Sequence, residues 1–161
     1  MNVGKRNLIV NIGPPGDVVR TTVLLRELSG DIFWLSSEKC RDVLNSQRIS
    51  RVYFVEDEKD IRDLKDSNFD LVISLNEEKK ALEIVKELKF RKIIGVYFDD
   101  IENIKYTPES NYWFDMSLAS RFGKEGADKI KLKNLKSVPQ ILIEMIRKKW
   151  KGQEYDILSQ K

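Results

Sequence analysis

The stretch Asn7–Leu28 constrains the fold more than any other part of the chain. It opens with a short apolar run, 7–12, of the kind that forms a buried strand. Gly13-Pro14-Pro15-Gly16 follows and interrupts regular structure. Helical spacing of apolar residues then begins at Asp17. The pattern predicts a strand, a tight loop and a helix, and in an open parallel sheet such a loop lies where ligands bind.

Length and composition predict one globular domain, since 161 residues with 41% hydrophobic and 34% charged residues are enough to form a core. No apolar run is long enough to span a membrane, and the N-terminus lacks a signal-peptide pattern, so we expect a cytoplasmic protein. A net charge of +3 is too balanced for a dedicated nucleic-acid binder. Without histidine, a general base must be a carboxylate, Tyr, Lys or Cys. The single cysteine, Cys40, is expected to be a small buried residue. One cysteine and no histidine give too few ligands for a zinc site, so no metal site is predicted.

Strand-like runs and helical segments alternate over the first hundred residues. The expected strands are Leu8–Ile12, Ile32–Leu35, Val52–Val55, Leu71–Leu75 and Ile93–Phe98. The expected helices are Asp17–Leu28, Glu38–Leu44, Lys59–Lys65 and Glu77–Leu88, the first ending at a Ser29-Gly30 cap. Such alternation is typical of βαβ units, so we predict an α/β fold with a parallel sheet and helices on both faces.

The rhythm changes after Phe98. Residues 99–108 predict a loop or small hairpin, and Glu109–Phe122 predicts a helix closed by Gly123. Residues 124–137 are polar and rich in lysine. Val138–Trp150 predicts an amphipathic helix with Pro139 in its first turn and Gly152 as its cap. We therefore expect one domain over residues 1–152, with 153–161 as a C-terminal extension or the start of an interdomain linker.

Three interpretations of Gly13–Thr22 compete. A phosphate-binding loop fits poorly, because the spacing matches neither the P-loop nor the dinucleotide fingerprint and Asp17 would repel a phosphate. Asp17 is also a favoured N-cap residue, although Arg20 at the third position gives no capping box. Finally, Asp17 at the mouth of the sheet could act as a general base for an incoming hydroxyl.

Resemblance to a known family favours the general base. Residues 11–28, with their Gly-Pro-Pro-Gly-Asp loop and Thr21-Thr22, resemble the opening of glycosyltransferase family 9, the ADP-heptose:lipopolysaccharide heptosyltransferases. Residues 68–78 are similar to the fourth strand of that family and its turn. Residues 112–123 and 143–155 resemble segments found in one of its branches. Together these stretches extend over nearly the whole chain.

The resemblance implies the N-terminal half of a GT-B fold, in which two Rossmann-like domains face a cleft. It assigns Asp17 as the catalytic base that deprotonates the acceptor hydroxyl in a direct, inverting displacement at the anomeric carbon. The predicted acceptor-binding residues are Gly13, Gly16, Arg20, Thr21, Thr22 and Asn76. At Val23, many members of the family have Pro or Ala instead.

The donor-binding motifs of the family are absent from this sequence. A nucleotide-sugar such as ADP-heptose is therefore expected to bind a second domain, in cis or in trans, and this chain alone is expected to transfer no sugar. No cofactor is expected here. The acceptor would be a lipopolysaccharide-type or other glycan, or a lipid-linked one, with peripheral contact at the inner face of the membrane. The alternatives are a non-catalytic module that binds a glycan or a partner, and a nucleotide-binding regulator with measurable ADP affinity.

Each secondary candidate has a plain structural alternative. Asn76 could hydrogen-bond a sugar or merely form a turn, and Arg20 could pair with Asp17, meet an acidic acceptor or be solvated. Tyr112 and Trp113 could form a platform for the acceptor or pack in the core. Arg147–Lys151 could meet an anionic membrane surface or simply complement a helix dipole.

Overall fold

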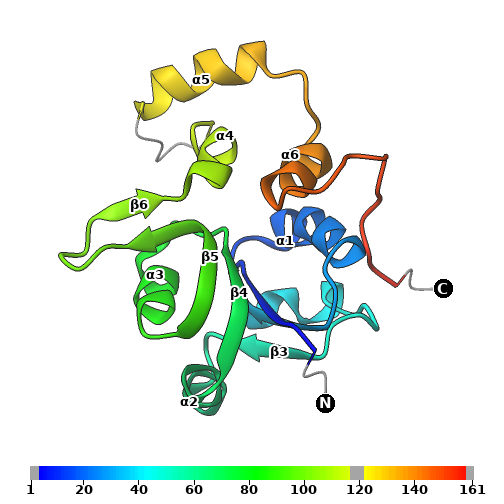
Figure 1. Cartoon of the computed structure of the whole chain (residues 1–161), viewed down its shortest axis with the longest axis vertical. Helices are drawn as coiled ribbons and strands as arrows, with labels where there is room; N and C mark the ends of the chain where they lie inside the picture. Colours follow the sequence, from blue (N-terminus) through cyan, green and yellow to red (C-terminus); the bar gives the residue numbers. More distant parts are fainter. Residues whose placement is uncertain (1–3, 117–121, 159–161) are drawn as a thin grey trace.

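The computed structural model describes residues 4–116 and 122–158, which form a six-stranded sheet in the order β3-β2-β1-β4-β5-β6 (Figure 1). The strands are β1 (Arg6–Val10), β2 (Asp31–Ser36), β3 (Arg51–Phe54), β4 (Asn68–Ser74), β5 (Lys89–Phe98) and β6 (Ile104–Tyr106). The first five are parallel, and β6 runs antiparallel to β5. All five predicted strands are confirmed, as is the hairpin after Phe98.

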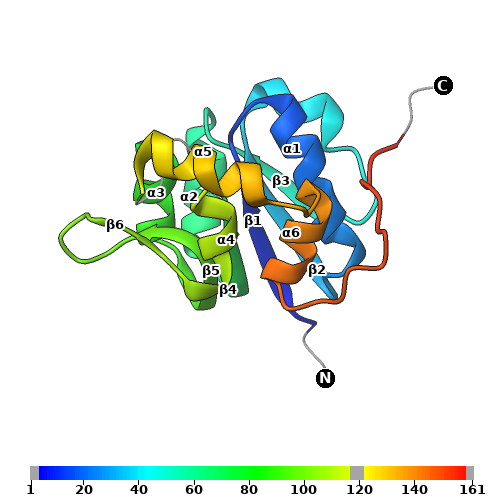
Figure 2. The same cartoon turned by 90° about the horizontal axis from the view of Figure 1, so that it is seen from above.

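Helices cover both faces of the sheet, as predicted (Figures 1 and 2). The helical elements are α1 (Pro15–Thr21), η1 (Thr22–Arg26), η2 (Glu38–Val43), α2 (Glu58–Asp66), α3 (Lys79–Lys86), η3 (Pro108–Ser110), α4 (Asn111–Phe114), α5 (Gly123–Lys133) and α6 (Val138–Met145). The two-residue period of β1 divides the core: Ile9 packs with α1, η1 and α6, while Leu8 and Val10 pack with α2 and α3. The fold is therefore a three-layer α/β domain of Rossmann-like type.

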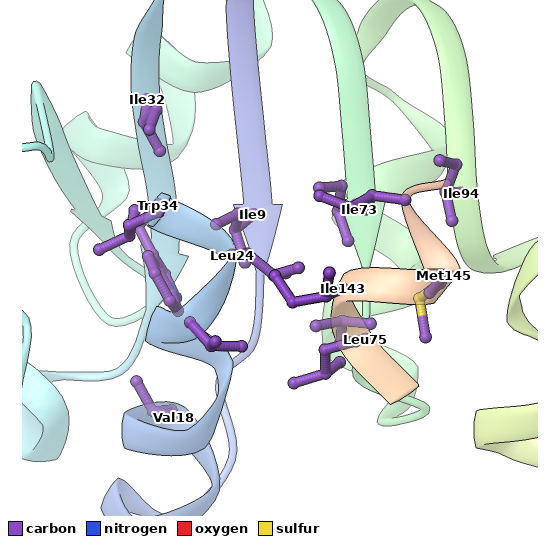
Figure 3. Close-up of a cluster of buried hydrophobic side chains, with 14 of the residues drawn as sticks. Ile9, Val18, Leu24, Ile32, Trp34, Ile73, Leu75, Ile94, Ile143 and Met145 are labelled. Atoms are coloured by element: carbon purple, nitrogen blue, oxygen red, sulfur yellow. The ribbon is translucent and has the colours of Figure 1, made fainter. Parts of the chain in front are cut away.

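Helix α6 belongs to this core although it lies far along the chain from the strands that it covers. Ile143 and Met145 pack in one cluster with Ile73, Leu75 and Ile94, as Figure 3 shows. Fully burying side chains of this size contributes about 1.5–3 kcal/mol each. The C-terminal third of the chain thus helps to fix the carboxyl ends of β4 and β5.

Helix α6 ends at Met145, so the predicted helix to Trp150 is wrong. Arg147 adopts a left-handed φ of 60°, and its N–H donates to the Glu144 carbonyl at 2.9 Å while Lys148 N–H donates to the Ile143 carbonyl at 3.1 Å. This pair of bonds is a Schellman motif, with an arginine where glycine is usual. The predicted start is confirmed, since Ser137 caps the helix by accepting from Gln140 N–H.

The predicted helix Asp17–Leu28 divides into α1 and the 3₁₀ segment η1. The hydroxyls of Thr21 and Thr22 donate to the carbonyls of Asp17 and Val19, which competes with regular helix geometry at this point. The predicted helix Glu38–Leu44 is likewise a 3₁₀ turn, η2.

The single helix predicted over Glu109–Phe122 is also wrong. Residues 108–114 form the short elements η3 and α4, and residues 117–121 lie outside the described parts of the chain. Gly123 begins helix α5 rather than closing a helix. The rest of helix α5 lies in the lysine-rich stretch 124–137, for which the sequence predicted no element.

Residues 153–158 contain no regular element, yet they pack along η1 and the loop that follows η2. Arg26 donates to the carbonyls of Glu154 and Tyr155, and the Asp156 N–H donates to the Thr22 hydroxyl at 3.0 Å. Asp156 also pairs with Arg48 at 2.8 Å. The role of this segment as an extension or a linker stays a prediction.

Replacing Gly95 by alanine should destabilise the sheet severely. Gly95 has φ 123°, and a Cβ there would lie 1.9 Å from the Ser74 carbonyl oxygen on the neighbouring strand β4. The left-handed backbone and the steric clash together should lower the free energy of unfolding by about 2–5 kcal/mol in urea denaturation. Gly4→Ala is the control, because a Cβ at Gly4 meets nothing within 4 Å. Equal stability of the two variants would contradict this packing.

Candidate functional site

The strand order brings two loops together at one edge of the sheet. The chain winds from β1 towards β3 on one side and from β4 towards β6 on the other, so the carboxyl ends of β1 and β4 form a topological switch point. The loop 11–14 leaves β1 there, and the loop 75–78 leaves β4. A Cβ on Gly13 would lie 3.6 Å from the Asn76 side-chain nitrogen, so the two loops lie close together. Ligands of open α/β sheets bind at such a position.

A buried polar network holds the loop after β1. Asn11 is 6% exposed; its Nδ2 donates to the Thr21 hydroxyl at 2.9 Å, and its Oδ1 accepts from Gly13 N–H at 3.1 Å. The Cys40 thiol, buried as predicted, donates to the Gly13 carbonyl at 3.3 Å. Asn11 was not among the predicted site residues. The signal that could have found it is a polar side chain directly after an apolar strand, where a buried amide needs partners.

Asp17 lies on the surface at the start of α1. The N-cap of this helix is Pro14, which makes no side-chain cap bond, and Asp17 is the third helical residue. The interpretation of Asp17 as an N-cap is therefore wrong. Within residues 4–116 and 122–158, the Asp17 carboxylate has neither a hydrogen bond nor an ion pair, and it stays exposed. Asp17 thus lies in the first turn of α1, beside the switch point, with its carboxylate open to solvent.

The two threonines predicted to bind an acceptor point into the protein. Thr21 is 2% exposed and Thr22 is completely buried, with both hydroxyls in the bonds described above. Their evident role is to tie α1 to β1 and to the C-terminal segment. Arg20 is exposed and forms no ion pair with another described residue, so the structure does not pair it with Asp17.

Gly13 and Gly16 have different surroundings. Gly13 is buried, and a Cβ there would lie 3.1 Å from Asn11 Oδ1, tighter than an ordinary contact. A Cβ at Gly16 would meet no described atom within 4 Å. Gly13 thus serves the packing of the loop, whereas Gly16 leaves the backbone next to Asp17 uncovered.

The turn predicted as one of the two alternatives for Asn76 is confirmed. The Asn76 Oδ1 accepts from Glu78 N–H at 2.9 Å, and the residue is only 9% exposed. Next to it lies a cavity of about 340 Å³, lined by Leu75, Asn76, Glu77, Glu78, Trp113 and Phe114. Trp113 is half-buried and packs against two of the core clusters, which confirms the core-packing interpretation, and its ring still lines the cavity. Tyr112 is exposed, and its hydroxyl donates to Asn134.

Tyr106 contacts two residues that line this cavity, and its pKa is raised. The Tyr106 hydroxyl donates to a Glu77 carboxylate oxygen at 3.2 Å, and its ring packs against Phe114. Burial, followed by the nearby Glu77 charge, raises the pKa of Tyr106 to about 12. The phenol therefore stays protonated and keeps donating to Glu77 throughout the neutral range.

The described residues contain no group of three or more potential metal-ligating His, Cys, Asp or Glu side chains. Among the helices of the described ranges, none is long and apolar enough to cross a bilayer. Lys148, Lys149 and Lys151, which follow α6, are exposed.

The comparisons with known proteins support the fold. No family model and no curated protein matches this sequence. The crystal structure of a glycosyl transferase family 9 protein from Veillonella parvula DSM 2008 is similar, with a TM-score of 0.54 at 16% sequence identity. The match covers 83% of this chain and 43% of that one, so this chain corresponds to less than half of the solved protein. The Rossmann-like fold implied by the resemblance is confirmed.

Thr21→Val should destabilise the loop after β1, because it leaves the buried Asn11 amide without its acceptor. We expect a loss of about 1–3 kcal/mol in the free energy of unfolding, measured by urea denaturation. Gly16→Ala, which enters open space, should stay within about 0.5 kcal/mol of wild type. If Thr21→Val proves as stable as Gly16→Ala, the buried network does not hold this loop.

Burial is the largest cause of the raised pKa of Tyr106 and remains in Glu77→Gln, but the neutral amide removes the second cause, the Glu77 charge, so this variant should lower the pKa from about 12. Phenolate absorbance during an alkaline titration measures this, and Tyr106→Phe identifies the signal among the five tyrosines. Since the folded pKa is raised, the contribution of Tyr106 to stability is complete below pH 10 and is lost as the pH rises through about 12. An unchanged titration in Glu77→Gln would contradict the coupling.

Proposed function

We propose that this chain is the acceptor-binding, base-carrying half of an inverting glycosyltransferase. The observation that supports this most directly is the Asp17 carboxylate, which is exposed, has no partner among the described residues and lies beside the switch point of the sheet. The likeness in fold to a family 9 glycosyl transferase supports the same reaction class. The sequence motif Gly-Asp followed by Thr-Thr agrees with it.

In the proposed reaction Asp17 accepts the proton of an acceptor hydroxyl while that oxygen attacks the anomeric carbon of a nucleotide-sugar. The new glycosidic bond forms as the bond to the nucleoside diphosphate breaks, which inverts the anomeric configuration. The uncovered backbone at Gly16 gives the acceptor room to approach, and Arg20 is exposed on the next turn of α1. Asn11, Thr21 and Thr22 contribute indirectly by holding α1 in place.

The donor would bind a second domain, joined to this chain or supplied by another polypeptide. That domain would provide positive charge or a helix N-terminus for the leaving diphosphate. The proposed donor is a nucleotide-sugar such as ADP-heptose, and the proposed acceptor is a lipopolysaccharide-type or other glycan. The exposed lysines after α6 are compatible with peripheral contact at an anionic membrane surface in the cytoplasm.

Asp17→Asn should lower sugar transfer by about 10²–10⁴-fold, because it removes the general base without changing the shape of the side chain. The measurement is turnover of a nucleotide-sugar by this chain fused to a family 9 donor-binding domain. The matched control is Asp42→Asn, which neutralises another exposed carboxylate, in η2 and outside the switch point.

Both variants should unfold at nearly the wild-type temperature, since the Asp17 carboxylate makes no contact with the described residues. Near-normal turnover of Asp17→Asn would refute the role as base. Glycan binding without turnover, in the fusion with intact Asp17, would favour the alternative of a non-catalytic binding module. Tight ADP binding by this chain alone would instead favour a nucleotide-binding regulator.

A further inference from the structure

The cavity at the end of β4 combines an apolar wall with a polar one. Leu75, Trp113 and Phe114 supply the apolar side, and Asn76, Glu77 and Glu78 supply the polar side, around a volume of about 340 Å³. A mostly apolar cavity with a few convergent polar groups is the usual form of a small-molecule site. Because Asn76 also lies close to Gly13, the cavity is near the loop that leads to Asp17.

The amide of Asn76 has hydrogen-bond donors that are not used within the protein. Its Oδ1 is bound by Glu78 N–H, which fixes the orientation of the side chain, but Nδ2 donates to no described residue. The residue is more than nine-tenths buried, at 9% exposure. Although most of the residue is buried, Nδ2 is not among the fully buried side-chain atoms without a partner, so it reaches the solvent and its N–H groups are available to a ligand.

Carboxylates supply the complementary acceptors. One oxygen of Glu77 accepts from the Tyr106 hydroxyl, and Asn76 fixes the main chain of Glu78, whose exposed side chain can turn to meet a ligand. A sugar hydroxyl both donates and accepts a hydrogen bond. Adjacent amide donors and carboxylate acceptors therefore match neighbouring hydroxyl groups better than they match a purely apolar or a purely anionic ligand.

Trp113 makes the apolar wall rigid. Its ring packs against the cluster that contains Phe114 and Val96 and against the cluster that contains Ile143. An aromatic face held in this way can cover the C–H face of a ring while the hydroxyls meet the polar side.

We propose that this cavity binds one sugar ring of the acceptor, an inference that rests on the proposed function. Asn76 Nδ2 donates to a ring hydroxyl, the Glu78 carboxylate accepts from a neighbouring hydroxyl, and Trp113 packs against the apolar face of the ring. The proximity of Asn76 to Gly13 puts this ring near the loop that leads to Asp17.

The test is a titration of the ¹⁵N-labelled chain with methyl α-glucopyranoside, methyl α-galactopyranoside and methyl α-mannopyranoside, followed by two-dimensional NMR. The three tryptophans give three indole N–H signals, which Trp113→Phe and Trp150→Phe assign. We expect at least one glycoside to shift the Trp113 indole signal and the Asn76 side-chain amide pair, while the fully buried Trp34 signal stays in place. Cyclohexanol, which has the ring but lacks the set of hydroxyls, should shift them far less.

Asn76→Asp keeps the oxygen that accepts from Glu78 N–H but removes both donors, and it should weaken glycoside binding about tenfold or more. Glu78→Gln should weaken it severalfold, because charge-assisted hydrogen bonds are about twice as strong as neutral ones. Glu83→Gln, an exposed position on the same helix that pairs with Lys79, is the matched control and should bind as wild type does. The spectra themselves report whether each variant is folded.

The proposal is overturned if no glycoside shifts the Trp113 and Asn76 signals, if cyclohexanol shifts them equally, or if folded Asn76→Asp and Glu78→Gln bind as wild type does. Asp17→Asn should retain the glycoside shifts, because the base does not line the cavity. If the glycoside shifts are retained but Asp17→Asn still transfers sugar at a near-normal rate, the role of Asp17 as base is refuted and the sugar site stands. An essential Asp17 without any shifts would refute the sugar site alone.

Discussion

The candidate site depends on one buried amide, that of Asn11. It joins the end of β1 to the start of α1 by donating to Thr21 and accepting from Gly13 N–H. Inside the protein, where an unpaired amide would cost about 1–3 kcal/mol, these bonds leave the loop few alternatives. The loop geometry then determines that Asp17 emerges at the surface while its neighbours Val18 and Thr21 stay buried.

The order of the strands brings together site residues that are distant in the sequence. Gly13 and Asn76 are far apart in the sequence and become neighbours only because β4 lies next to β1. The winding reverses between these two strands, and ligands of open α/β sheets bind at such a reversal. Short elements that follow β6 then close one side through Trp113 and Phe114. The site is thus assembled from three separate parts of the chain.

The elements that depend on local sequence patterns were predicted correctly, whereas features that depend on contacts between distant residues were not. The five parallel strands and the β1–α1 turn followed from apolar runs and glycine positions. The end of α6 could not be predicted, because Arg147 adopts a left-handed conformation that is usually found at glycine. The exposure of Asp17 fits the predicted base, but the burial of Thr21 and Thr22 was not foreseen, since their partners Asn11 and Asp156 come from elsewhere.

In the loop after β1, buried polar groups fix the backbone while exposed groups stay accessible to a ligand. In its proposed role as general base, Asp17 must stay accessible and unpaired, and such a group contributes little to stability. The surrounding fold must therefore hold it through other residues, here the amide of Asn11, the thiol of Cys40 and the hydroxyl of Thr22. Asn76 combines both roles in one side chain, because its oxygen fixes the turn while its nitrogen stays free of described partners. The groups available for chemistry are thus positioned by neighbours whose own polar atoms are already satisfied.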